Sequence, residues 1–244
     1  MEYGLDPTDL VGVSFWIISA AMVAATFFFW VERDRAVGKW KTSLTVAAMV
    51  TGIAAIHYFY MRGVWATTGE SPTVFRYVDW LLTVPLQIVE FFLILSAIAI
   101  VRTSLFWKLL IASVVMLVAG YFGELNPANP GMLWGLFILG TLAWLYIIYE
   151  IFAGEASKIN AANGTAASKR AFSALRIIVT FGWAIYPIGY VLGYVGPGDN
   201  EATLNLIYNL ADFVNKIAFG VVIWAAATSE DSVALAREPK VVLD

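Results

Sequence analysis

Two apolar stretches of the chain carry ionisable residues: Arg76, Asp79 and Glu90 in the first, Asp212 and Lys216 in the second. Ionisable side chains are costly inside a membrane, and they usually mark paths for ions or protons. A lysine at membrane depth can condense with an aldehyde to form a Schiff base, for which nearby carboxylates act as counter-ions. The alternative is a buried ion pair that only holds helices together.

The first of these stretches predicts a helix with one polar face. At 100° per residue, five side chains fall within about 80° of one another: Arg76, Asp79, Thr83, Gln87 and Glu90. The two carboxyls are separated by roughly 16 Å along the helix axis. Hydrogen bonding between helices explains one threonine or glutamine, but it explains a stripe with two carboxyls and an arginine poorly. We therefore expect a path with one carboxyl in each half of the membrane.

A later stretch predicts an aromatic wall. In a helix, Trp183, Tyr186, Pro187 and Tyr190 share one face. Taken alone, such a stripe is usually ordinary packing. A lysine in the middle of the next apolar stretch favours the wall of a cofactor pocket instead, and Trp80 is a candidate for the same wall.

The composition limits the class of protein. Apolar residues make up 60% of the 244, and only 14% are charged, against roughly 25% in soluble domains. A net charge of −3 argues against nucleic acid as a partner. With no cysteine and a single histidine, His57, disulfides, thiolate sites and multi-histidine metal sites are excluded. A polytopic helical membrane protein is the class that fits.

The chain contains seven stretches of roughly 20 apolar residues, and we predict an all-α bundle of seven transmembrane helices that forms one domain over residues 1–244. The only long linker is 154–170, and 229–244 is a polar tail. Glu124 and Glu150 are interpreted as solvated helix ends. The predicted spans are about 10–31, 41–61, 74–101, 106–123, 132–153, 171–195 and 202–228.

The basic residues predict the orientation. Twelve of the fifteen lie on one side of the predicted spans, Arg62 and Arg76 lie on the other, and Lys216 lies within a span. Because basic loops stay in the cytoplasm, the N-terminus is expected outside and the C-terminus inside. The start of the chain has no basic segment typical of a secretion signal. Either the first span directs insertion or a signal has been removed, and both alternatives stay open.

Three of these segments resemble the signature of the microbial rhodopsin family: residues 76–85, 183–187 and 212–216. The resemblance extends over all seven predicted spans. Within that family the chain is similar to the proteorhodopsins, because Glu90 stands where archaeal pumps have aspartate and because His57 is present on the second span.

The resemblance implies a cofactor and a set of roles. All-trans retinal would be bound covalently to Lys216 as a protonated Schiff base. Asp79 would be the primary counter-ion and proton acceptor, and Asp212 the second counter-ion. Arg76 would organise the outer half-channel. Glu90, which would hold a proton in the dark, would reprotonate the Schiff base from the cytoplasmic side.

The same resemblance implies supporting residues. Thr83 would hydrogen-bond Asp79, and His57 would pair with Asp79 and tune its proton affinity. Gln87 would lie beside the polyene. The remaining pocket residues implied by the family are Trp80, Trp183, Tyr186, Pro187 and Tyr190, with Phe137, Gly140 and Trp144 from the fifth span.

The function implied is a light-driven outward proton pump, a transporter and not an enzyme, in the inner membrane of a bacterial cell. Asp79, Thr83 and Glu90 distinguish it from the family's sodium and chloride pumps. A photosensory rhodopsin with a slow photocycle is the alternative, although no transducer is evident. A receptor for a diffusible ligand would suit the composition but would not need Lys216. The family suggests a ring of protomers, with a pentamer favoured.

Gln87 predicts the colour. Green-absorbing proteorhodopsins have leucine at this position. An amide near the Schiff base stabilises the positive charge of the ground state, and excitation moves that charge away, so the energy gap widens and blue light is absorbed. We expect Gln87→Leu to move the absorption maximum of the retinal-loaded protein to longer wavelength. An unchanged maximum in the visible spectrum would mean that Gln87 does not lie beside the chromophore.

Overall fold

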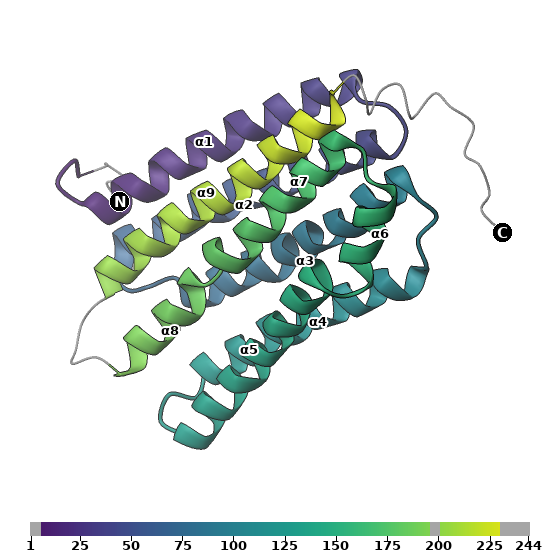
Figure 1. The fold of residues 1–244 in the computed structure, drawn as a ribbon. Coiled ribbons are helices and arrows are strands. Elements are labelled where there is room, and N and C mark those ends of the chain that lie inside the picture. The colour runs from purple at the N-terminus through teal and green to yellow at the C-terminus, as the bar shows by residue number, and fades with distance from the viewer. Residues whose placement is uncertain (1–5, 196–200, 230–244) are drawn as a thin grey trace.

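The computed structural model describes residues 6–195 and 201–229. The part described is helical, with no strand (Figure 1). Seven helical segments are long and apolar enough to cross a membrane, so the predicted all-α seven-helix fold is confirmed. The elements are α1 (Leu10–Glu32), η1 (Arg33–Arg35), α2 (Lys39–Thr68), α3 (Thr73–Ile98), α4 (Thr103–Glu124), α5 (Pro130–Phe152), α6 (Glu155–Asn163), α7 (Ala166–Ile177), η2 (Ile178–Gly182), α8 (Ile185–Val195) and α9 (Glu201–Ala227).

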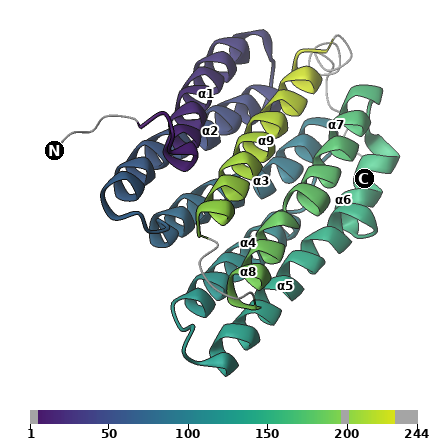
Figure 2. The same cartoon turned by 90° about the vertical axis from the view of Figure 1, so that its left-hand side faces the viewer.

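The helices lie side by side and alternate in direction (Figure 1). We call the end at which α1 begins the N-terminal end of the bundle, and the end at which α9 stops the C-terminal end. α9 packs against α1 and α2 on one side and against α7 and α8 on the other (Figure 2). α9 is therefore in contact with both halves of the bundle.

The largest difference from the predicted bounds is in α2, which was expected to end near residue 61. Gly38 and Gly69 have positive φ angles of 57° and 69°, and they set the two ends of α2. α2 is therefore 30 residues long, and His57 lies eleven residues before its end, not near the end as expected. The predicted linker 154–170 is largely helical, because it holds α6 and the first turn of α7. Of the predicted tail 229–244, all but Ser229 lies outside the described residues.

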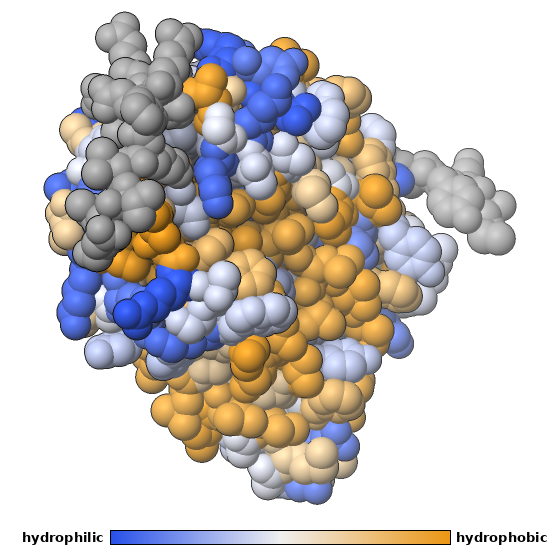
Figure 3. Space-filling view, turned by 90° about the vertical axis from the view of Figure 1, so that its right-hand side faces the viewer, coloured by the Kyte–Doolittle hydropathy of each residue, from blue (hydrophilic) through white to orange (hydrophobic). Residues whose placement is uncertain are grey.

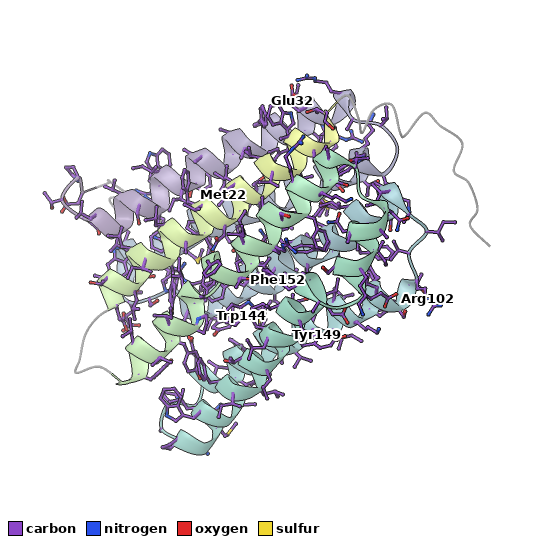
Figure 4. The ribbon with its side chains drawn as sticks, in the orientation of Figure 1. Met22, Glu32, Arg102, Trp144, Tyr149 and Phe152 are labelled. Atoms are coloured by element: carbon purple, nitrogen blue, oxygen red, sulfur yellow. The ribbon has the colours of Figure 1, made fainter. Side chains whose placement is uncertain are left out.

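The sixth crossing is not one continuous α-helix. A π-helical turn, η2, joins α7 to α8. Pro187 has no N–H to offer the preceding turn, which is why α8 begins only at Ile185. Side chains from neighbouring helices bind the carbonyls of η2: Trp144 Nε1 donates to Val179 O at 3.0 Å, and Asn215 Nδ2 donates to Gly182 O at 3.0 Å. Figure 4 shows Trp144 on α5 in the middle of the bundle.

The outer surface of the bundle is apolar. Large side chains such as Phe27, Ile56 and Phe181 are about two-thirds exposed. Figure 3 shows a broad apolar area on one face, with polar residues gathered mainly near its edges. The buried side chains, in contrast, include Arg76, Lys216 and several carboxyls. An apolar outer surface around buried charged side chains is the reverse of the pattern in a soluble protein, and it suits a protein surrounded by lipid.

Close packing of α9 against α1 depends on Gly220. A methyl group at this position would overlap the ring of Phe29, which is fully buried. At the C-terminal end, Trp224 Nε1 donates to Glu32 Oε2 at 2.7 Å, so the two helices are joined there as well (Figure 4).

We expect Gly220→Ala to destabilise the fold by about 1–3 kcal/mol, the usual cost of overpacking a core. The measurement is the midpoint of thermal denaturation in detergent, followed by circular dichroism. Gly63→Ala in α2 is the matched control, because a methyl group there meets no atom within 4 Å. Equal midpoints for the two variants would show that the contact between Gly220 and Phe29 is not tight.

Candidate functional site

The centre of the bundle holds a buried ion cluster. Lys216 Nζ donates to Asp79 Oδ2 and, at 2.8 Å, to Asp212 Oδ2. The three side chains are at most 2% exposed. Asp212 and Lys216 are four residues apart on α9 and so share a face, while Asp79 reaches them from α3. The structure therefore brings together the three residues that were predicted to act as acceptor, second counter-ion and Schiff-base lysine.

The two carboxylates have different surroundings. Asp212 accepts three further hydrogen bonds, from Tyr58 OH at 2.8 Å, Tyr186 OH at 2.6 Å and Trp80 Nε1 at 3.2 Å. Hydrogen bonds to a charged carboxylate stabilise its charged form. Asp79 Oδ1, in contrast, has no hydrogen-bond partner among the described residues. Asp79 is thus the carboxylate with a free acceptor oxygen beside the lysine.

Both predicted partners of Asp79 lie beside it, and each also has a contact within its own helix. Thr83 Oγ1 donates to the backbone carbonyl of Asp79 at 2.9 Å, so it bonds its own helix and not the carboxylate. Threonine in a helix commonly bonds the carbonyl four residues earlier. His57 Nδ1 lies 3.7 Å from Asp79 Oδ1 but 3.0 Å from Ile53 O. His57 is therefore a close neighbour of Asp79, and its stronger contact is with its own helix.

Arg76 lies toward the N-terminal end of the bundle, one turn of α3 before Asp79. Its Nη2 donates to Asn205 Oδ1 at 2.7 Å and to Asn209 Oδ1 at 3.0 Å, and all three side chains are buried. The guanidinium faces amides and makes no ion pair with a described carboxylate. Two buried cations, Arg76 and Lys216, are thus balanced by two buried carboxylates within one cluster.

Glu90 lies on the same face of α3 but toward the C-terminal end. It is 1% exposed, and neither carboxyl oxygen has a hydrogen-bond partner among the described residues. A carboxyl without a partner in an apolar setting is far less costly when it is neutral. Glu90 therefore suits the storage of a proton, whereas Asp79, beside a cation, suits its acceptance.

An apolar cavity adjoins the ion cluster. Trp80 and Tyr186 line it and also donate to Asp212, so its wall reaches the neighbourhood of Lys216. Gln87 is not in this wall; its Nε2 donates to Asn215 O at 3.2 Å, one residue before the lysine. Eight predicted pocket residues line the cavity: Trp80, Phe137, Gly140, Trp144, Trp183, Tyr186, Pro187 and Tyr190.

Two carboxyls expected to be solvated are paired instead. Glu124 Oε1 accepts from Tyr77 OH at 3.1 Å, and Glu124 lines the cavity. Glu150 is 5% exposed and accepts from Tyr146 OH at 3.1 Å and from the backbone N–H of Glu155 at 2.9 Å. Glu150 thus joins the end of α5 to the first turn of α6. In the described part of the chain, no group of His, Asp and Glu side chains is placed to hold a metal.

The polar residues that support the buried charges were not among the predicted site residues. Tyr58 binds Asp212, and Asn205 and Asn209 bind Arg76. A signal for the two asparagines was present, because 205, 209, 212 and 216 follow the spacing of one helix face. No comparable signal pointed to Tyr58, because a tyrosine in an apolar stretch is usual packing.

Comparison with known proteins agrees with this geometry. The profile of the family described as bacteriorhodopsin-like protein matches residues 9–230. The chain belongs to the bacteriorhodopsin-like family. It is 59% identical to the green-light absorbing proteorhodopsin of Gamma-proteobacterium EBAC31A08 over 229 residues, which cover 93% of this chain and 90% of that protein. It is 56% identical to the blue-light absorbing proteorhodopsin of Gamma-proteobacterium Hot 75m4, with the same shares covered.

A solved structure is similar as well. The crystal structure of blue light-absorbing proteorhodopsin from Med12 matches with a TM-score of 0.77 and 57% identity, over 90% of this chain and 98% of that chain. Members of the bacteriorhodopsin-like family carry a retinal chromophore on a lysine. Lys216 is the one buried lysine among residues 6–195 and 201–229, and the aromatic cavity beside it suits a long apolar polyene. The residues present therefore fit this group.

Lys216 also neutralises its neighbours before any chromophore is bound. We expect Lys216→Met to destabilise the retinal-free protein by about 3–5 kcal/mol, because it leaves Asp79 and Asp212 buried without the cation between them. Thermal denaturation in detergent measures the loss. Adding Asp79→Asn to Lys216→Met removes one uncompensated charge and should restore part of the stability. A single variant as stable as the parent would contradict the ionised cluster.

Proposed function

We propose that this chain is a light-driven proton pump that absorbs blue light, with all-trans retinal on Nζ of Lys216. One observation carries the proposal: α3 presents two buried carboxyls on one face, one in contact with the lysine and the other further toward the C-terminal end of the bundle. Asp79 contacts Lys216 Nζ, whereas Glu90 is isolated and buried about 16 Å further along the same helix face. A path with a carboxyl on each side of one transferable proton is what directional transport needs.

Retinal, when bound, supplies the absorption of light and an isomerisation that reorients the proton on Lys216 Nζ. The residues that would hold it are the aromatic side chains of the cavity, chiefly Trp80, Trp183 and Tyr186. Two of these also donate to Asp212, so the walls of the pocket and the counter-ion are fixed together. The pocket thereby orients Nζ relative to both carboxylates.

Asp79 then receives the proton from Lys216 Nζ. Its oxygen Oδ1 is free to accept it, whereas Asp212 remains ionised because three neutral donors and the lysine already bind it. This transfer neutralises Lys216 and Asp79 together and leaves Arg76 and Asp212 as the charged residues of the cluster, with Arg76 toward the N-terminal end. The charge of Arg76 then favours expulsion of a proton toward that end.

Glu90 afterwards returns a proton to Lys216 Nζ from the C-terminal side. Its burial without a partner favours a neutral carboxyl at rest, as this step requires. The distribution of basic residues supports an outer N-terminus and a cytoplasmic C-terminus, in the inner membrane of a bacterial cell. With that orientation the donor is inside, the acceptor is outside, and transport is outward. A ring of protomers, with a pentamer favoured, is the assembly that we propose.

The proposed colour rests on Gln87. Its amide donates to the carbonyl of Asn215, directly before Lys216, so a dipole is fixed close to the lysine. Relatives of both colours are similarly close in sequence, so overall identity does not separate them. An amide held near the charged end of the chromophore supports blue absorption.

The decisive measurement is the light-induced pH change of cells that express the chain and are supplied with retinal. We expect acidification of the medium, abolished by a protonophore. Asp79→Asn should abolish it because the acceptor is lost. Glu90→Gln should slow the return of the proton to Lys216 by about 100-fold, the usual contribution of a positioned acid.

Glu70→Gln is the matched control, because Glu70 is an exposed carboxyl beyond the end of α2, and it should pump normally. A folded, coloured protein that leaves the pH unchanged would contradict pumping and favour a photosensory role.

A further inference from the structure

Arg76 and Asp79 carry complementary groups that do not pair. They are three residues apart on α3, a spacing at which oppositely charged side chains of one helix are neighbours. Nε and Nη1 of Arg76 have no hydrogen-bond partner among the described residues, and neither has Oδ1 of Asp79. Within residues 6–195 and 201–229 the two side chains nonetheless form no ion pair. Something other than their spacing therefore keeps the guanidinium away from the carboxylate.

Two asparagines of α9 hold the guanidinium instead. Arg76 Nη2 donates to Asn205 Oδ1 at 2.7 Å and to Asn209 Oδ1 at 3.0 Å. Both asparagines are fully buried, and they precede Asp212 on α9 by about two and one helical turns. Their oxygens therefore lie nearer the N-terminal end of the bundle than the ion cluster does, and they draw the guanidinium toward that end.

The orientation of both amides is fixed by their other hydrogen bonds. Nδ2 of Asn205 donates to the backbone carbonyl of Glu201 at 2.9 Å. Nδ2 of Asn209 donates to Ser14 Oγ of α1 at 2.8 Å, and that hydroxyl donates in turn to a backbone carbonyl of α1 at 2.7 Å. Because an amide nitrogen only donates and an amide oxygen only accepts, these bonds leave both oxygens directed at Arg76.

Three aromatic rings surround the same guanidinium. Cζ of Arg76 lies 5.7 Å from the ring centroid of Phe15, 5.5 Å from that of Tyr208 and 6.0 Å from that of Trp80. A cation at this distance from an aromatic ring is attracted to it. Arg76 is thus held by two amides and three rings, none of them charged. These groups stabilise the buried cation without neutralising its charge.

We propose that Asn205 and Asn209 are positioning residues: they hold the guanidinium of α3 away from Asp79 and so keep the oxygen Oδ1 open to a proton. The inference rests on the proposed function, in which Asp79 is the acceptor. In that transfer an N–H bond of Lys216 Nζ breaks, its electron pair stays on the nitrogen, and an O–H bond forms on Asp79. Charge-assisted bonds from Arg76 to the carboxylate would stabilise its ionised form and oppose this step.

The test replaces both asparagines with leucine, which is of similar size and accepts no hydrogen bond. In the double variant Asn205→Leu/Asn209→Leu, the guanidinium of Arg76 loses its two acceptors and should pair with Asp79. The carboxylate then offers less negative charge to Lys216, so the positive charge of the ground state is stabilised less and the energy gap narrows. In alkaline buffer, the absorption maximum of the retinal-loaded protein should move to longer wavelength.

The same double variant should also slow the first proton transfer. The loss of the proton from Lys216 Nζ, followed by flash spectroscopy, should be about tenfold slower than in the parent, which corresponds to about 1.4 kcal/mol in the barrier. Asn209→Asp keeps an acceptor oxygen for Arg76 and, unlike Asn209→Leu, should cause no shift to longer wavelength. These two single variants carry the test if the double variant does not fold.

Two controls show whether the asparagines act through Arg76. In an Arg76→Gln background there is no guanidinium to release, so replacing both asparagines with leucine should leave the absorption maximum unchanged from that of Arg76→Gln alone. Asn126→Leu removes an amide that donates to Phe122 O at 2.8 Å, and it should match the parent in absorption and rate. A shift that persists without Arg76, or a double variant that matches Asn126→Leu, would overturn the proposal.

The role of Asp79 as acceptor is tested separately, by the light-induced pH change of Asp79→Asn. If Asp79→Asn abolishes acidification but the asparagine variants keep the parent absorption and rate, the acceptor stands and only the positioning role of the asparagines is wrong. If Asp79→Asn still acidifies the medium, the acceptor assignment fails, and the role proposed for the two asparagines fails with it.

Discussion

The contact of one lysine ammonium with two buried carboxylates is the interaction on which the rest of the structure depends. Charges of this kind are stable at membrane depth only when they are paired and hydrogen-bonded. α3 and α9 must therefore meet at a fixed register, with Asp79 opposite Lys216. The aromatic residues that bind Asp212 come from α2, α3 and α8, so the same requirement also fixes the second and sixth crossings of the bundle against α9.

Three carboxyl groups of the bundle differ in the charges and hydrogen-bond donors that surround them. Asp79 and Asp212 both touch Lys216, yet one keeps an open oxygen and the other is bound by three neutral donors. Glu90 has neither a cation nor a neutral donor with good geometry among the described residues. Three carboxyls on two helices are thus held in three environments, and their different proton affinities follow from what surrounds each of them.

Most of the fold and the centre of the site could be predicted from the sequence. Apolar length identifies the spans, and ionisable residues inside them are rare enough to stand out. The helix bounds were predicted less well, because the end of α2 and the whole of α6 lie in segments whose polar composition is typical of loops. The partners of Thr83 and Tyr58 could not be derived, since composition and spacing do not show whether a hydroxyl bonds its own helix or a neighbour. The π-helical turn also depends on tertiary partners, Trp144 and Asn215, that are distant in the sequence.

The order of the charged residues along the chain has a consequence for biosynthesis. α3, with Arg76, Asp79 and Glu90, is made long before α9, which brings Asp212 and Lys216. Until the last helix enters the membrane, Asp79 lacks its lysine and Arg76 lacks the two asparagines that bind it. The helices made earlier therefore cannot form these buried contacts until α9 has entered the membrane. Insertion of α9 is the step that supplies these partners, so a chain that ends before α9 keeps Arg76 and Asp79 unpaired by them at membrane depth.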